Sequence, residues 1–260
     1  MTRTSTATPW GWALVGALLG LLLTTILQAP ARWFTPWLQT ATDGRFVLQD
    51  ARGTLWQGSA QLTLAGGAGS TDAATLPGRL AWKILPRWSG LQAELLSDCC
   101  MQQPWRFDLQ PHWGGARLAL ADGLSQWPAK ALSGLGTPWN TVQPEGSLAL
   151  STTGLSLEWA AGRLLVAGRT QLDATHISSR LSTLKPMGSY RITVQGGSTA
   201  TLQLETLEGS LQLSGHGQWV GGQLRFDGEA SAAPERQDAL ANLLNIIGRR
   251  DGARAIIKVG

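Results

Sequence analysis

The sequence predicts an all-β protein with one N-terminal transmembrane helix. We expect a long antiparallel meander that forms an open or partly closed barrel-like sheet, capped by a short C-terminal helix. Three observations carry this prediction: one long uncharged apolar run, apolar residues that alternate with others beyond residue 45, and Gly, Asn, Asp and Ser between the alternating runs. Alternation is typical of strands with one buried and one hydrated face, and the intervening residue types favour turns.

The composition excludes several classes of protein. The chain has 260 residues, of which 43% are hydrophobic and 15% charged, and its net charge is +4. Intrinsic disorder requires low hydrophobicity and high net charge, and a polytopic membrane protein requires more than one long apolar run. Nucleic-acid binders usually gather Lys and Arg on one face, whereas most basic residues here are scattered singly. We therefore expect no nucleic-acid partner.

The apolar run is long enough to cross a membrane. No charged residue occurs between Arg3 and Arg32, and Trp10 to Leu27 is almost wholly apolar or small. At about 1.5 Å per residue, a helix over this run just spans a hydrocarbon core of roughly 30 Å. A cleaved signal peptide is the alternative, because Ala29-Pro30-Ala31 resembles a cleavage site, but its apolar region is normally only about 7–15 residues long. The aromatic residues expected at the two bilayer interfaces are Trp10, Trp12, Trp33 and Trp37.

These features divide the chain into an anchor and a body. We expect a short tail at 1–9, a transmembrane anchor at 10–27, a linker at 28–45 and a β-rich body at 46–260. The positive charges on the two sides of the anchor are nearly balanced, so they do not decide its orientation. The body is interpreted as one unit or as two similar halves, 46–140 and 141–260.

Alternation recurs along the whole body and predicts roughly a dozen or more strands. The apolar positions in the clearest segments are Leu80, Trp82 and Ile84; Trp105, Phe107 and Leu109; Leu155, Leu157 and Trp159; Tyr190, Ile192 and Val194; Leu202 and Leu204; and Leu211 and Leu213.

One unit occurs four times: a Trp, a short turn with Gly, two apolar residues two positions apart, and a closing Gly. The four units begin at Trp56, Trp113, Trp159 and Trp219. The last two units align without a gap, with glycines at Gly162 and Gly168, and at Gly222 and Gly228. The unit predicts a β-hairpin in which glycine lets the chain reverse. Because Trp buries roughly 150–250 Å², we favour packing at the sheet ends over a stacking platform for sugars, bases or lipid.

Two helical segments interrupt the strands. Pro128 to Leu135 could form two turns, closed by Gly136. The clearer helix starts near Pro234, places its leucines at helical spacing and ends at Gly248, and a last strand covers Ala253 to Val259. Such an amphipathic helix is interpreted as a cap on an open sheet, with a partner-binding face as the alternative.

The residues predict neither an enzyme, a metal site nor a cofactor. The three histidines have no metal-ligand spacing to each other or to the cysteines, and the chain has neither a nucleophile elbow nor a P-loop. Cys99 and Cys100 are a candidate vicinal disulfide. The Cα atoms of neighbouring residues lie about 3.8 Å apart, below the usual disulfide range of about 4.4–6.8 Å, whereas an oxidising compartment favours pairing. Both states stay open.

Five segments spread over nearly the whole chain resemble the type II secretion system protein N family, also called general secretion pathway protein N. These segments are Gly53 to Ala60, Leu76 to Trp82, Leu181 to Arg191, Gly209 to Gly217, and Ala239 to Arg249. The resemblance implies a single-pass protein of the cell inner membrane, with a cytoplasmic tail at 1–9 and a periplasmic body at 46–260. It also implies a part in the export of folded proteins across the outer membrane. It implies no catalytic residues.

The sequence leaves three hypotheses about the function. The leading hypothesis is an accessory subunit of the type II secretion machinery, which contacts inner-membrane platform or periplasmic components through its sheet edges or its helix-capped end. The alternative is a periplasmic carrier or groove for a hydrophobic ligand such as lipid. The third hypothesis, a tryptophan-based glycan binder, requires several Trp exposed on one face.

Overall fold

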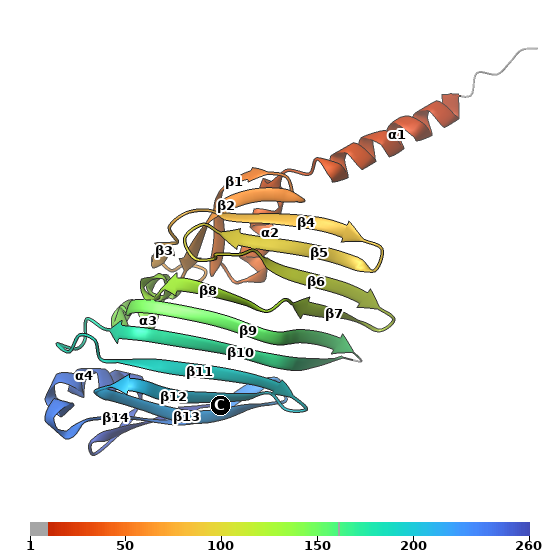
Figure 1. Ribbon diagram of the computed structural model, residues 1–260. Coiled ribbons are helices and arrows are strands. Elements are labelled where there is room, and N and C mark those ends of the chain that lie inside the picture. The colour runs from red at the N-terminus through yellow and green to blue at the C-terminus, as the bar shows by residue number, and fades with distance from the viewer. Residues whose placement is uncertain (1–9, 161) are drawn as a thin grey trace, which may run out of the picture.

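A computed structural model describes residues 10–160 and 162–260. Helix α1 (Trp10–Leu27) extends away from the sheet, and none of its side chains is buried (Figure 1). Among the described helices it alone is long and apolar enough to cross a membrane. The predicted helix is therefore confirmed and is a candidate membrane span. The expected tail at 1–9 lies outside the described residues.

The segment expected as a linker contains two short helical elements, η1 (Ala31–Trp33) and α2 (Phe34–Ala41). Two hydrogen bonds attach the end of α1 to the loop after the first strand. Trp56 Nε1 donates to the carbonyl oxygen of Ile26 at 2.8 Å, and the backbone N–H of Leu55 donates to the carbonyl oxygen of Ala29 at 2.8 Å. The anchor therefore joins the sheet at a defined place.

The body is one antiparallel sheet of sixteen strands. Strands of its first part are β1 (Phe46–Gly53), β2 (Gln57–Ala65), β3 (Ala73–Thr75), β4 (Leu80–Arg87), β5 (Gly90–Ser97), β6 (Trp105–His112), β7 (Gly115–Leu120) and β8 (Gly123–Pro128). The remaining strands are β9 (Glu145–Ala160), β10 (Arg163–Ser178), β11 (Gly188–Gly197), β12 (Thr201–Gly209), β13 (Leu211–Val220), β14 (Gln223–Ala232), β15 (Arg249–Asp251) and β16 (Arg254–Val259).

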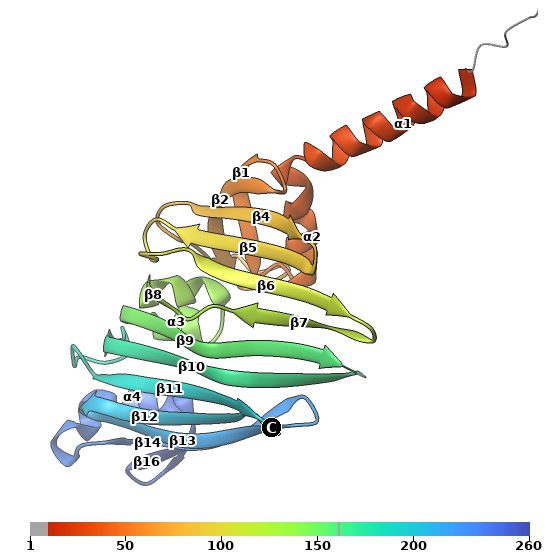
Figure 2. The ribbon, with the colours of Figure 1, turned by 45° about the vertical axis from the view of Figure 1, so that its right-hand side comes forward.

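The sheet is an open meander. Strands pair mostly in chain order from β1 to β14, followed by β16 and β15, while β3 pairs with β2 and β8 with β9. Figures 1 and 2 show these strands stacked from the anchor end to the C-terminal end without closure. Both β7 and β8 pair with β9, so the sheet continues across residue 140. The predicted fold class is confirmed, and the similarity of two halves stays a prediction.

The remaining helical elements are η2 (Ala129–Leu135), α3 (Trp139–Val142), η3 (Pro234–Arg236) and α4 (Gln237–Ile247). The two predicted helical segments are present, although the first is a 3₁₀ helix. Gly248 follows α4 in an extended conformation. A side chain there would collide with the carbonyl oxygen of Ile256 on the adjacent strand, so this glycine permits a close return of the chain.

Candidate functional site

One side of the sheet is apolar from β4 to β12. Directly paired residues on antiparallel strands point to the same side, so the register assigns each side chain to a face. Trp82 pairs with Leu95, Leu95 with Trp105, and Leu118 with Leu157. The same side continues through Val166, Leu172, Ile192, Val194, Leu202 and Leu204. We call this side the apolar face.

The opposite side, the polar face, carries charges that are paired across strands. Two rows of alternating charge are Lys83–Glu94–Arg106 and Asp173–Arg191–Glu205. Arg191 donates two hydrogen bonds to the Asp173 carboxylate, at 2.7 and 2.9 Å. These bonds hold the pKa of Asp173 below its ordinary value. The polar face is therefore suited to solvent, whereas the apolar face needs a cover.

At the anchor end, α2 covers part of the apolar face and leaves a groove of about 350 Å³. Phe34 and Leu38 of α2 line one wall. The strands provide the other wall, mainly through Leu62, Leu80, Trp82, Ile84, Leu95 and Phe107. Trp82 Nε1 donates to the carbonyl oxygen of Leu55 at 3.1 Å, so the polar atom of this indole is satisfied within the wall. We call this space the α2 groove.

At the C-terminal end, α4 packs closely against the apolar face. Leu240 and Leu244 are fully buried, and they pack in one cluster with Leu211, Ala230 and Ala255 of the strands. The periodicity of this helix was visible in the sequence, and its interpretation as a cap is confirmed by this packing.

Between the two helices most apolar side chains are only half-buried, although Leu148 on β9 is buried. Leu118, Leu157, Val166 and Ile192 are examples of the half-buried side chains. All strands of the described ranges belong to a single sheet, so no second sheet faces these side chains. The molecule thus has an apolar strip whose cover is incomplete, and this strip is the candidate functional site.

The recurrent tryptophans lie in two environments. Trp56 and Trp219 are half-buried, whereas Trp113 is fully exposed and Trp159 is 53% exposed. The packing interpretation is therefore wrong for Trp113 and Trp159, because these rings lie at or beside hairpin turns with no layer over them. Trp88, which the sequence pattern missed, is also fully exposed, in the turn between β4 and β5. In Figure 1 the β4–β5, β6–β7 and β9–β10 turns all lie on the right, at the same end of the strands.

The glycines of the recurrent unit have distinct positions. Gly162 and Gly222 lie in the β9–β10 and β13–β14 turns with φ of +75° and +84°, which explains the need for glycine there. Gly168 lies at an irregularity of the β9–β10 register with φ of +89°. Gly228 is within β14, where a side chain would collide with the ring of Phe226.

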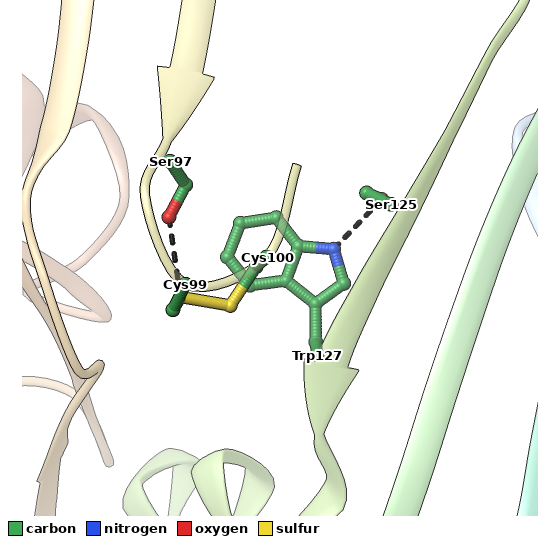
Figure 3. Close-up of a disulfide and its surroundings, with 5 residues drawn as sticks. All are labelled: Ser97, Cys99, Cys100, Ser125 and Trp127. Carbon is green, nitrogen blue, oxygen red and sulfur yellow. Dashed lines mark hydrogen bonds between the residues drawn. A yellow bond between two sulfur atoms is a disulfide. The ribbon is translucent and has the colours of Figure 1, made fainter. Parts of the chain in front are cut away.

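Cys99 and Cys100 are joined by a disulfide in the loop between β5 and β6 (Figure 3). Ser97 Oγ lies 3.3 Å from Cys99 Sγ, and the carbonyl oxygen of Cys100 accepts a hydrogen bond from the backbone N–H of Gln126 at 2.7 Å. On β8, Trp127 Nε1 donates to Ser125 Oγ at 2.8 Å. This disulfide loop is thus attached to β8.

Nothing in the described ranges indicates metal chemistry, since no three His, Cys, Asp or Glu side chains are grouped to hold an ion.

The sequence patterns did not predict the groove-wall residues Phe34 and Leu38, because these residues fell in the expected linker. Their spacing of four positions is a helical signal, but a segment this short gave no clear period.

A family model for type II secretion system protein N matches residues 45–257, from just before β1 into β16. No significant similarity was found to a curated protein or to a solved structure. The family is not a known enzyme family, and it implies a role in type II secretion. Because the match covers most of the sequence and the entire sheet up to its last residues, this chain belongs to the type II secretion system protein N family.

Proposed function

We propose that the chain is an accessory subunit of the type II secretion machinery, held in the inner membrane by α1 with its β body in the periplasm. The single observation that carries this proposal is the family match over residues 45–257. The fully exposed apolar α1 supports membrane anchoring, because an unburied helix of this length and composition needs a non-aqueous environment.

The free edge of β1 is the contact that we propose for other secretion components, either of the inner-membrane platform or of the periplasm. Among the described strands, β1 pairs with β2 alone, and an unpaired strand edge accepts an added strand. The usable edge is Phe46 to Gln49, since the register with β2 is interrupted after Gln49 and Asp50 has a φ of +48°. An isolated bridge from Pro30 to Thr54 attaches the other end of β1 to the segment that follows the anchor.

Site-specific photocrosslinking in cells that contain the whole machinery tests this contact. A photoreactive residue in place of Gln49 is expected to form adducts with other secretion components. The control is Gln203, which is also exposed but lies on β12 with strands paired on both sides. Equal adducts from both positions, or none from Gln49, would contradict the proposed edge.

The topology has its own test. The mature protein should begin at Met1 or Thr2, and protease added to spheroplasts should digest the body. An N-terminus at Arg32 would instead show cleavage after Ala31 and remove the anchor.

The incomplete cover of the apolar face favours a second candidate function, the binding of a hydrophobic ligand such as lipid. A soluble body normally buries such a surface, since large exposed apolar patches mark interaction sites or ligand grooves. The two functions are compatible, because the edge and the face are different surfaces of the sheet.

A further inference from the structure

We infer that the α2 groove binds an acyl chain of a membrane lipid, which enters from the anchor end of the sheet. This inference rests on the second candidate function and names its ligand class and its site. Four properties of the groove carry it: the chemistry of its walls, the absence of free backbone groups on a sheet face, its connection to the anchor, and its size.

The walls present almost only carbon atoms. Glu94 is the one charged residue among the described residues that line the groove. Its carboxylate forms an ion pair with Arg106, at 3.1 Å, and both residues belong to the polar face. The indole N–H of Trp82 is bonded to a backbone carbonyl within the wall. A polar ligand would lose its hydration in this space without gaining hydrogen bonds, which is costly.

The position of the groove on a sheet face distinguishes hydrocarbon from polypeptide. Strands β4, β5 and β6 are each paired on both sides, so their backbone N–H and C=O groups are engaged with neighbouring strands. An extended peptide laid across this face would find no backbone partners, and its own backbone groups would be desolvated. An acyl chain has no such groups and gains from burial at about 25 cal/mol per Å².

A second apolar pocket lies between the α2 groove and the end of the membrane anchor and adjoins the groove. This pocket, of about 250 Å³, is lined by Ala29, Pro30, Trp33, Phe34, Trp37 and Leu55, and it shares Phe34 and Leu55 with the α2 groove. It begins two residues after α1 ends. Trp33 and Trp37 are 59% and 62% exposed, as expected of aromatic residues at a membrane interface. An acyl chain that leaves the bilayer there meets two adjoining apolar pockets.

The size of the groove fits a ligand, and the strip beyond it offers further contact. A volume of about 350 Å³ lies within the range of roughly 300–1,000 Å³ that is typical of ligand pockets. The apolar face then continues from β7 to β12. With strands about 4.8 Å apart, the eight strands from β4 to β12 along the sheet span on the order of 35 Å, a length comparable to that of an extended acyl chain or longer.

Lipid photolabelling of the full-length chain tests the inference. The chain is reconstituted into vesicles of phosphatidylethanolamine and phosphatidylglycerol that contain a small fraction of phosphatidylcholine with a diazirine on one acyl chain. After illumination, the labelled peptides are mapped by mass spectrometry. We expect label on α1, which serves as an internal reference, and also on peptides of β4 to β6.

Two matched substitutions then assign that label to the groove. Ala93→Phe fills the groove from β5, because Ala93 lies on the apolar face between its partners Ile84 and Phe107. Ala81→Phe adds the same ring to the polar face of β4, opposite Leu96. Both alanines are half-buried. Ala93→Phe should reduce the label on β4 to β6 at least fivefold and leave the α1 label unchanged, whereas Ala81→Phe should change neither.

Label confined to α1 in the wild-type chain would overturn the inference, and this outcome does not depend on how either variant folds. Equal strand labelling in wild type and Ala93→Phe would also overturn it. If a second copy of the chain covers the face, the strands stay unlabelled while crosslinked dimers form, which again contradicts an acyl-chain site. The crosslinking at Gln49 is a separate measurement. If only the acyl-chain site is wrong, the strand label is absent while the Gln49 adducts still form. If only the subunit role is wrong, the Gln49 adducts are absent while the strand label remains.

Discussion

The two ends of the apolar face receive very different covers from helices of similar amphipathic character. At the C-terminal end, α4 buries Leu240, Leu243 and Leu244 to 2% exposure or less. At the anchor end, none of the residues of the eight-residue α2 is buried, and a groove remains between this helix and the strands. The same alternating pattern therefore produces a closed core at one end and an open apolar surface at the other.

This difference shows that alternation alone does not make a core. Apolar side chains on one face of a sheet are removed from water only where another element packs on them. An open apolar surface in a stable protein is typical of an interaction site. The anchor end and the middle of the sheet are therefore where we place ligand contact, and the α4 end is where we place most of the stability.

The largest expected effect tests whether the α4 end of the sheet provides most of the stability. Leu244→Ala should lower the free energy of unfolding by about 2–5 kcal/mol, as other buried Leu→Ala changes do. Leu157→Ala, in the half-buried middle of the strip, should cost only about 1 kcal/mol. Thermal and denaturant unfolding of the full-length protein in detergent measures both. A cost at Leu157 equal to that at Leu244 would mean that the strip is covered in solution.

Substitution of the recurrent tryptophans should change the free energy of unfolding by an intermediate amount. Trp219→Ala should cost about 2 kcal/mol because its ring is half-buried, whereas Trp159→Ala should cost about 1 kcal/mol or less because its ring is 53% exposed. The same unfolding assay applies, with cellular protein level as a second readout. A large loss at Trp159 would restore the packing interpretation for that residue.

The smallest effect concerns the polar face and its dependence on pH. Asp173 has a lowered pKa in the folded protein because Arg191 donates two hydrogen bonds to it. Its stabilisation is therefore present above the unfolded pKa of about 3.9, and it is lost as the pH falls through the lowered folded value. Asp173→Asn should cost about 1 kcal/mol at neutral pH, and its difference from wild type should shrink in acid.

A matched control for this prediction lies further along the polar face. Asp227 forms a longer ion pair with Lys258, at 3.4 Å, in which both side chains are more than half exposed. Asp227→Asn should therefore change the free energy of unfolding by only a few tenths of a kcal/mol. Stability curves of both variants from neutral pH down to about pH 1.5, measured beside wild type, separate the two pairs. Identical curves would show that the Asp173–Arg191 pair contributes no more to the free energy of unfolding than the Asp227–Lys258 pair.

Much of the fold could be predicted because it rests on local patterns. The alternation of Leu80, Trp82 and Ile84 assigns three side chains to one face of a strand whatever the neighbours are. The helical spacing of Leu240, Leu243 and Leu244 likewise specifies which side of α4 is apolar. The uncharged run from Trp10 to Leu27 requires no tertiary information at all. Each of these predictions agrees with the structure.

Burial could not be predicted in the same way, because it depends on segments that are far apart in the chain. Trp159 and Trp219 occupy equivalent positions in units that align without a gap, yet one is exposed and the other half-buried. The disulfide loop at Cys99 and Cys100 contacts β8 through Gln126, a partner that no local pattern indicates.

The elements, their apolar sides and the candidate anchor could thus be read from the amino-acid sequence, since periodicity and length are properties of short segments. Which part of the apolar face is covered could not be read there and follows from tertiary packing. That outcome depends on where α2 and α4 pack on the sheet; Phe34 and Leu38, for example, line one groove with Phe107, which is far from them in the chain. The free energy of such long-range packing is the sum of many contacts that a single segment does not contain.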